Sequence, residues 1–115
     1  MDSILETMLT VAGDSPSMPA YETDIMIFVN GLFGRLKNLG IGPEEGFYIT
    51  GNEETWDDFM EEGPERAAVQ SYMTFKLKLM FDPPQNSTVL QSYERLAAEF
   101  EWNAQMDAEM AEEEE

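Results

Sequence analysis

The chain has 115 residues, which is enough for one domain with a modest hydrophobic core. Its 24 acidic and 6 basic residues give a formal net charge of −18, so its surface repels nucleic acid and anionic membranes and attracts basic partners. The chain contains no Cys and no His, which excludes disulfides, thiolate metal sites and the commonest general base.

The start of the chain lacks the basic segment of a signal peptide, and no apolar run approaches the roughly 20 residues that span a bilayer. We therefore expect a soluble protein that is made in the cytoplasm and has no membrane contact.

The first part of the chain predicts two helices. Ser3 and Glu6 have capping-box spacing, and an apolar face follows them until Gly13. After a loop with two prolines, apolar residues recur at helical spacing from 22 to 39. Gly31 and Gly34 each weaken this second helix by about 1 kcal/mol relative to Ala, so we expect them to permit close packing against another helix.

The next segment, residues 40–61, predicts a loop and a short helix. F-Y-I-T at 47–50 is the best strand candidate, because glycines bound it on both sides. Asn52 is placed to cap a helix over 53–61. This helix carries carboxylate pairs that resemble a divalent-metal site, but such pairs are expected by chance in a chain with 24 acidic residues. We predict a solvated or interface-facing acidic surface and no metal site.

The stretch T-F-K-L-K-L-M-F-D-P-P at 74–84 alternates like a strand, yet a helix from 64 to 81 is favoured. No turn residue interrupts the apolar periodicity before Asp82, no β-branched residue lies between Phe75 and Phe81, and the two prolines end the helix. One face of this helix consists of Val69, Tyr72, Met73, Leu77 and Met80.

Two lysines of this helix differ in position. Lys76 falls within the apolar face, whereas Lys78 points to the opposite side. A lysine on an apolar face either extends its charge to solvent or meets a carboxylate. For Lys76 we consider two partners, the acidic helix at 53–61 of the same chain or an acidic residue of a neighbouring subunit.

A last helix is predicted at 87–105, with Thr88 and Gln91 at capping-box spacing. The apolar face of this helix does not continue into the acidic stretch at 106–115. That stretch either solubilises the protein or docks on a basic partner. The predicted fold is thus all-α, a small bundle of about five helices with a loop or short β segment near 40–52. We expect one domain, residues 1–105, followed by the acidic tail.

No phosphate loop, nucleophile elbow or dinucleotide fingerprint is present, so we expect no enzyme and no cofactor.

Three segments carry a resemblance to a known family: G-I-G-P-E-E-G-F-Y-I-T at 40–50, T-W-D-D-F at 55–59, and A-A-V-Q-S-Y-M-T-F-K-L-K-L-M-F-D-P-P at 67–84. Over roughly residues 1–105 the chain resembles head–tail connector, or adaptor, proteins of tailed bacteriophages. The acidic tail lies outside the resemblance.

The resemblance implies a mostly helical virion protein at the head–tail junction. Members form a dodecameric ring beneath the portal protein, with DNA passing through the lumen without specific binding and a stopper or tail-completion protein on the other side. The resemblance implies a subunit contact through the loop at 40–52. We predict that the interface involves Phe47, Tyr48, Ile49, Trp56, Lys76 and Lys78. The implied portal-docking element is the last helix with its tail, through Tyr93, Phe100, Trp102, Met106 and Met110.

Two alternatives from other classes remain open. An acidic inhibitor that mimics DNA, such as an anti-restriction protein, would bind a basic nuclease, but its carboxylates would form one long stripe. Here they cluster at 53–65 and in the tail. A small acidic regulatory protein that uses its tail as a ligand is the other alternative.

Overall fold

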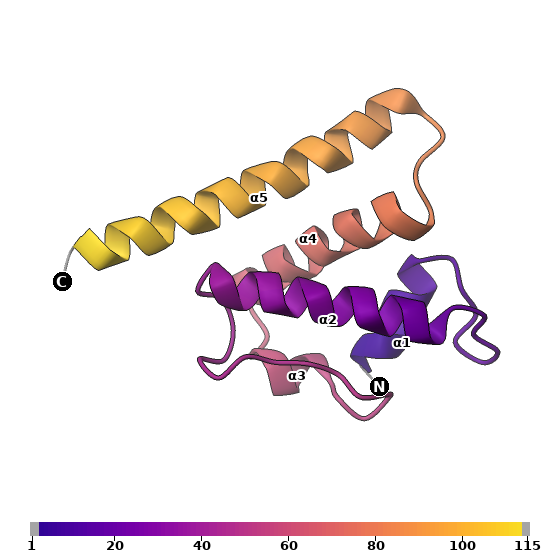
Figure 1. The fold of residues 1–115 in the computed structure, drawn as a ribbon. Helices are drawn as coiled ribbons and strands as arrows, with labels where there is room; N and C mark the ends of the chain where they lie inside the picture. Colours follow the sequence, from indigo (N-terminus) through magenta and orange to yellow (C-terminus); the bar gives the residue numbers. More distant parts are fainter. Residues whose placement is uncertain (1–2, 114–115) are drawn as a thin grey trace.

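A computed structural model describes residues 3–113 and contains five helices in this part of the chain. They are α1 (Ile4–Val11), α2 (Glu22–Asn38), α3 (Trp56–Phe59), α4 (Pro64–Phe81) and α5 (Ser87–Glu113) (Figure 1). The β-pairing among these residues is limited to an isolated antiparallel bridge between Ser3 and Thr55. The predicted all-α fold with about five helices is confirmed.

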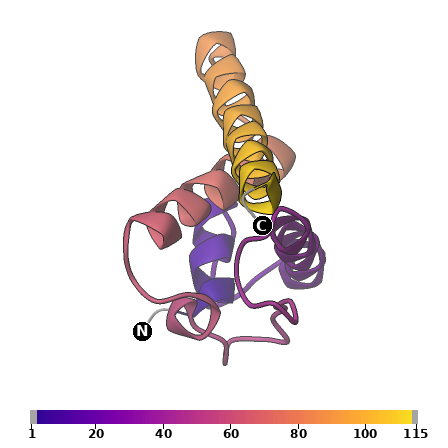
Figure 2. The same cartoon turned by 90° about the vertical axis from the view of Figure 1, so that its left-hand side faces the viewer.

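The helices are arranged around α4, which contacts α1, α2 and α5. Figures 1 and 2 show α3 and the preceding loop below this group, and α5 lying over it. The C-terminal end of α5 reaches well past the end of α2 in Figure 1. Part of α5 therefore projects from the body of the protein.

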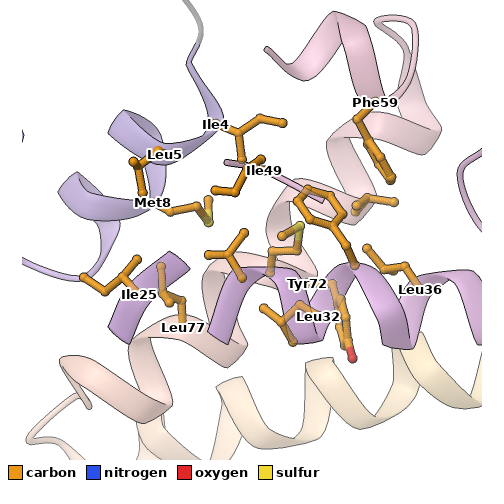
Figure 3. Packing of buried hydrophobic residues seen from close by; sticks show 14 of the residues in the cluster. Ile4, Leu5, Met8, Ile25, Leu32, Leu36, Ile49, Phe59, Tyr72 and Leu77 are labelled. Atoms are coloured by element: carbon orange, nitrogen blue, oxygen red, sulfur yellow. The ribbon is translucent and has the colours of Figure 1, made fainter. Parts of the chain in front are cut away.

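The core lies where α1, α2 and α4 meet, as Figure 3 shows. Ile4, Met8, Val29, Leu36 and Leu77 are among its fully buried side chains. Each such side chain contributes about 1.5–3 kcal/mol through burial. The apolar periodicity that predicted these helices thus marks the faces that meet in the core.

The predicted apolar face of α4 is correct except at its end. Val69, Tyr72, Met73 and Leu77 are buried, but Met80 is exposed. Met80 borders an open cleft beside the loop that follows α1, whereas Phe81, the next residue, packs against the core.

The prediction that Gly31 and Gly34 pack closely against another helix is wrong within this chain. Both glycines are exposed on the outer side of α2, and a Cβ atom at either position would meet nothing within 4 Å.

The predicted strand at 47–50 is a loop, because a side chain replaces the partner strand. Asn30 of α2 donates to the Ile49 carbonyl through Nδ2 at 3.0 Å and accepts from the Ile49 amide at 2.7 Å. Both polar groups of this buried residue are therefore satisfied without a ladder. Gly42 is needed nearby, since its φ is +91° and a Cβ atom there would lie 2.7 Å from the Phe59 ring.

Of the three helix caps predicted from the sequence, one is confirmed. The Ser3 hydroxyl accepts from the Glu6 amide, as expected. Asn52 does not cap α3; Thr55 does, in a reciprocal capping box with Asp58 that shortens the predicted helix to Trp56–Phe59. Thr88 does not cap α5, because the Asn86 side chain accepts from the backbone amides of Thr88 and Val89.

The stretch predicted as a solvated tail continues α5 through Glu113, since Met, Ala and Glu are good helix formers. Glu114 and Glu115 lie outside the described residues. Within the described chain, the helices are too short or too polar to cross a membrane.

Candidate interaction surfaces

The outer side of α5 carries an apolar stripe, which we define as Trp102, Met106 and Met110. Their exposed fractions are 62%, 36% and 57%. A spacing of four residues places them along one face of the helix. This face is turned away from the residues that attach α5 to α4, so the stripe is free to contact another protein.

The inner side of α5 is held by two aromatic pairs. The Phe100 ring stacks on Tyr72 with centroids 4.5 Å apart and an interplanar angle of 18°, and Tyr93 lies 5.0 Å from Phe75. Ala97 is buried between these pairs. Two of the five predicted docking residues, Tyr93 and Phe100, therefore face the body of the protein, while the stripe residues face outward.

A polar cluster fastens the same side of α5 to two other helices. Glu101 accepts a hydrogen bond from the Tyr72 hydroxyl through Oε2, which also lies 3.7 Å from Lys76 Nζ. Its Oε1 lies 3.3 Å from Arg35 Nη2 of α2. Figure 3 shows the hydroxyl of Tyr72 directed away from the core. One carboxylate thus joins α2, α4 and α5.

The surroundings of this cluster shift two pKa values in opposite directions. Partial burial alone raises the pKa of Glu101, but the Tyr72 hydrogen bond and the charges of Lys76 and Arg35 outweigh it and hold the pKa below its usual value. Burial, and then the adjacent Glu101 carboxylate, raise the pKa of Tyr72 well above its usual value. Glu101 is therefore ionised, and Tyr72 is neutral, at neutral pH.

The two lysines of α4 both have partners within the chain. Lys76 pairs with Glu101 of α5 and not with the acidic helix expected from the sequence, because α5 covers that side of α4. Lys78 lies 3.7 Å from Asp82, four residues on. Lys76 remains partly exposed, so a contact with a neighbouring subunit stays a prediction.

The remaining predicted interface residues fall into two groups. Ile49 and Trp56 are buried, with Trp56 Nε1 donating to the Thr7 hydroxyl at 3.4 Å. Phe47 packs against Phe33 and Phe59 at centroid distances of 5.0 and 5.3 Å. Tyr48, by contrast, is 67% exposed. Of these four, Tyr48 alone presents most of its side chain to a neighbour.

Two of the acidic side chains at 57–65, Asp57 and Asp58, serve one ion pair and one cap. Asp57 lies 2.6 Å from Arg66, which also donates to the Met60 carbonyl, and Asp58 caps α3. In the described part of the chain, no group of three acidic residues is arranged to hold a metal ion.

Two open clefts flank the inner side of α5. One, of about 540 Å³, lies beneath its C-terminal half and is lined by Leu39, Ile41, Ala68, Phe100 and Ala104, among others. The other, of about 480 Å³, lies between α2, α4 and α5 beside Ile27 and Gly31.

Sequence reasoning missed Arg35, Glu101 and Ile27. Glu101 had a signal, because it follows Ala97 by four residues and so falls on the side of the last helix that the apolar residues Tyr93, Ala97 and Phe100 mark as inward-facing. A carboxylate there and Lys76 on the apolar face of α4 form a complementary pair. No sequence signal marked Ile27, since the sequence does not show which apolar residues of a helix remain exposed in the fold.

Comparison with known proteins gives one match. A family model described as "Phage connector protein" matches residues 4–111. No curated protein and no solved structure matches the chain.

Proposed function

Because the chain belongs to the phage connector protein family, a family of structural proteins, we propose that it forms a ring at the head–tail junction of a tailed phage. In this role it binds the portal protein on one side and a stopper or tail-completion protein on the other. It acts without catalysis and without a cofactor.

The observation that carries this proposal is the projecting outer face of α5. Trp102, Met106 and Met110 are exposed on a helix that is firmly attached to the body by its other side. Exposed Trp is typical of the anchors that dominate protein–protein binding, and Met is enriched in interfaces. We assign this stripe to the portal, with Tyr93 and Phe100 acting indirectly by holding α5 in place.

The charge of the chain supports a role beside DNA without binding it. With 24 acidic and 6 basic residues, the chain offers few cations to pair with phosphates. A ring lined by such a surface lets DNA pass without specific contacts. The family resemblance implies twelve copies of the chain in this ring.

The test is binding of the purified chain to the portal protein of the same phage, measured by sedimentation and surface plasmon resonance. We expect Trp102→Ala to weaken binding about 30-fold, corresponding to about 2 kcal/mol for an anchor residue. Met110→Glu should also weaken it, because it places a charge in the contact.

Met18→Glu is the matched control, since Met18 is an exposed methionine in the loop between α1 and α2. It should bind the portal like the wild type. A wild-type monomer that ignores the portal and binds a basic nuclease tightly would contradict the proposal and favour the DNA-mimic alternative.

A further inference from the structure

The cleft beside α2 is an apolar groove with a basic end. Ile27, Phe28, Gly31 and Leu32 line it together with Arg35, Tyr72, Lys76 and Glu101. Ile27 is 66% exposed, although it is a large aliphatic side chain in the middle of a helix. We call the outward part of α2 that borders this groove, Ile27, Gly31, Gly34 and Arg35, the α2 face.

The glycines of the α2 face pack against no other element in residues 3–113. Each destabilises the helix by about 1 kcal/mol relative to Ala, and nothing lies within 4 Å of where a Cβ atom would be. A glycine on an exposed helix face leaves room for another backbone to approach closely. Together with the uncovered Ile27, this shape suits a protein surface better than solvent.

The α2 face is also positively charged at one end, which is unusual in a chain of net charge −18. Arg35 is 54% exposed, and Lys76 is partly exposed beside it. Glu101 is the one carboxylate lining this groove, and it faces both cations. The groove therefore retains a positive excess that attracts an acidic partner.

A matching acidic surface exists on the same chain. Glu61, Glu62 and Glu65, which we call the acidic corner, are all exposed. None of them forms an ion pair among the described residues, because nearby Arg66 is buried and bound to Asp57 and the Met60 carbonyl.

The two surfaces lie on different sides of the protein. Figure 2 shows α2 on one side and the segment that joins α3 to α4 on the other, with α1 between them. When two complementary patches lie on different sides of one subunit, head-to-tail contacts repeat from copy to copy and close into a ring if the rotation permits.

We propose that the α2 face binds the acidic corner of a second copy of this chain. The inference rests on the proposed ring and assigns the surfaces that form it. The neighbour's acidic corner lies over Gly31 and Gly34 against Ile27, and its carboxylates face Arg35 and Lys76.

The first test is Gly31→Gln, with the assembly of the full chain measured by native mass spectrometry and analytical ultracentrifugation, alone and on the portal. Gln favours a helix more than Gly, so folding is retained or improved. We expect the assembly constant to fall about tenfold or more, because the side chain blocks close approach. Thr88→Gln, an enlargement at an exposed position in the first turn of α5, away from the apolar stripe, should assemble normally.

The second test exchanges charges across the proposed contact. Arg35→Glu and Glu62→Arg should each weaken assembly, and the double variant should recover most of the loss because opposite charges again face each other. Loss of the Arg35–Glu101 pair within the chain cannot produce such a rescue.

The outcomes separate the two proposals. If the wild type assembles and Gly31→Gln assembles equally well, or the double variant shows no rescue, the assignment of the α2 face is wrong and the ring stands. If the wild type stays monomeric both alone and on the portal, the proposed function and this inference both fail.

Discussion

Glu101 is the residue at which three helices are joined by polar contacts. Its carboxylate accepts from the Tyr72 hydroxyl and faces Lys76 and Arg35. Exposed ion pairs contribute little on their own, but this carboxylate is mostly covered and meets all three partners at once. It therefore fixes the rotation of α5, and with it the direction in which the apolar stripe points.

Replacing Glu101 with Gln should destabilise the protein by about 1 kcal/mol at pH 7, because both ion pairs are lost and the Tyr72 hydroxyl then donates to a neutral amide oxygen. The folded state lowers the pKa of Glu101, so its stabilisation is fully present above the unfolded-state pKa and is lost as the pH falls through the folded-state pKa. The difference between wild type and Glu101→Gln should thus disappear in acid. Urea unfolding at a series of pH values measures it.

Glu94→Gln is the control, because Glu94 is exposed on α5 and the same charge is removed. Its unfolding midpoint should stay close to that of the wild type at every pH. A Glu101→Gln deficit that persists below pH 3 would contradict the role given to ionised Glu101.

Contacts of single residues also explain why the predicted strand and part of the predicted interface were wrong or untestable from the sequence. The Asn30 side chain forms the two hydrogen bonds to Ile49 that a partner strand would otherwise form. Asn30 and Ile49 are 19 positions apart, and no local sequence pattern predicts a contact between them. Trp56 and Ile49 were predicted at a subunit interface, but large apolar residues are typical of both protein cores and interfaces. Exposure separates them, and it depends on the tertiary arrangement.

At the scale of elements, α5 divides into two parts with different neighbours. Its first part contacts α4 through Tyr93, Ala97 and Phe100. The part after Ala104 adds no residue to the buried core among the described side chains. The first part of α5 thus serves folding, and the proposed docking belongs to the turns that follow it.

Ending the chain after residue 105 should leave the fold intact, because the deleted residues whose side chains are described, 106–110, contribute nothing to the buried core. It should also abolish most portal binding, since Met106 and Met110 are removed together with six acidic residues. Circular dichroism with thermal unfolding checks the first expectation, and surface plasmon resonance on the portal checks the second. Unchanged portal binding would move the docking site away from this part of α5.

The helices themselves were largely predictable. The apolar period and its breakers located α2 and α4, since Gly40 ends one and Asp82-Pro83-Pro84 the other. Helix ends were less predictable, because Asn52, Thr55, Asn86 and Thr88 all have cap chemistry and the surrounding packing decides among them. The helical tail was missed because amphipathic periodicity fades there while helix propensity does not.

At the scale of the whole molecule, net charge opposes folding. A formal charge of −18 on 115 residues destabilises the compact state by self-repulsion. The five ion pairs of the described chain are mostly exposed and offset little of it.

Raising KCl from 0.05 to 0.5 M should therefore stabilise the protein, because screening weakens repulsion among many acids more than it weakens five ion pairs. We expect an increase of roughly 1 kcal/mol, or about 4 °C in Tm, for a domain of this size. Differential scanning calorimetry measures it. A fall in Tm would show that the ion pairs dominate.

The loop held by Asn30 has one further consequence. Because residues 47–50 are satisfied by a side chain instead of a strand, no sheet edge with unpaired amides and carbonyls is formed in residues 3–113. Edge strands allow open-ended growth, since each added chain presents a new edge. In the ring that we propose, copies of this chain meet instead through side-chain surfaces, and such contacts close where the rotation between copies permits. Open-ended growth by strand pairing along residues 47–50 is thereby avoided.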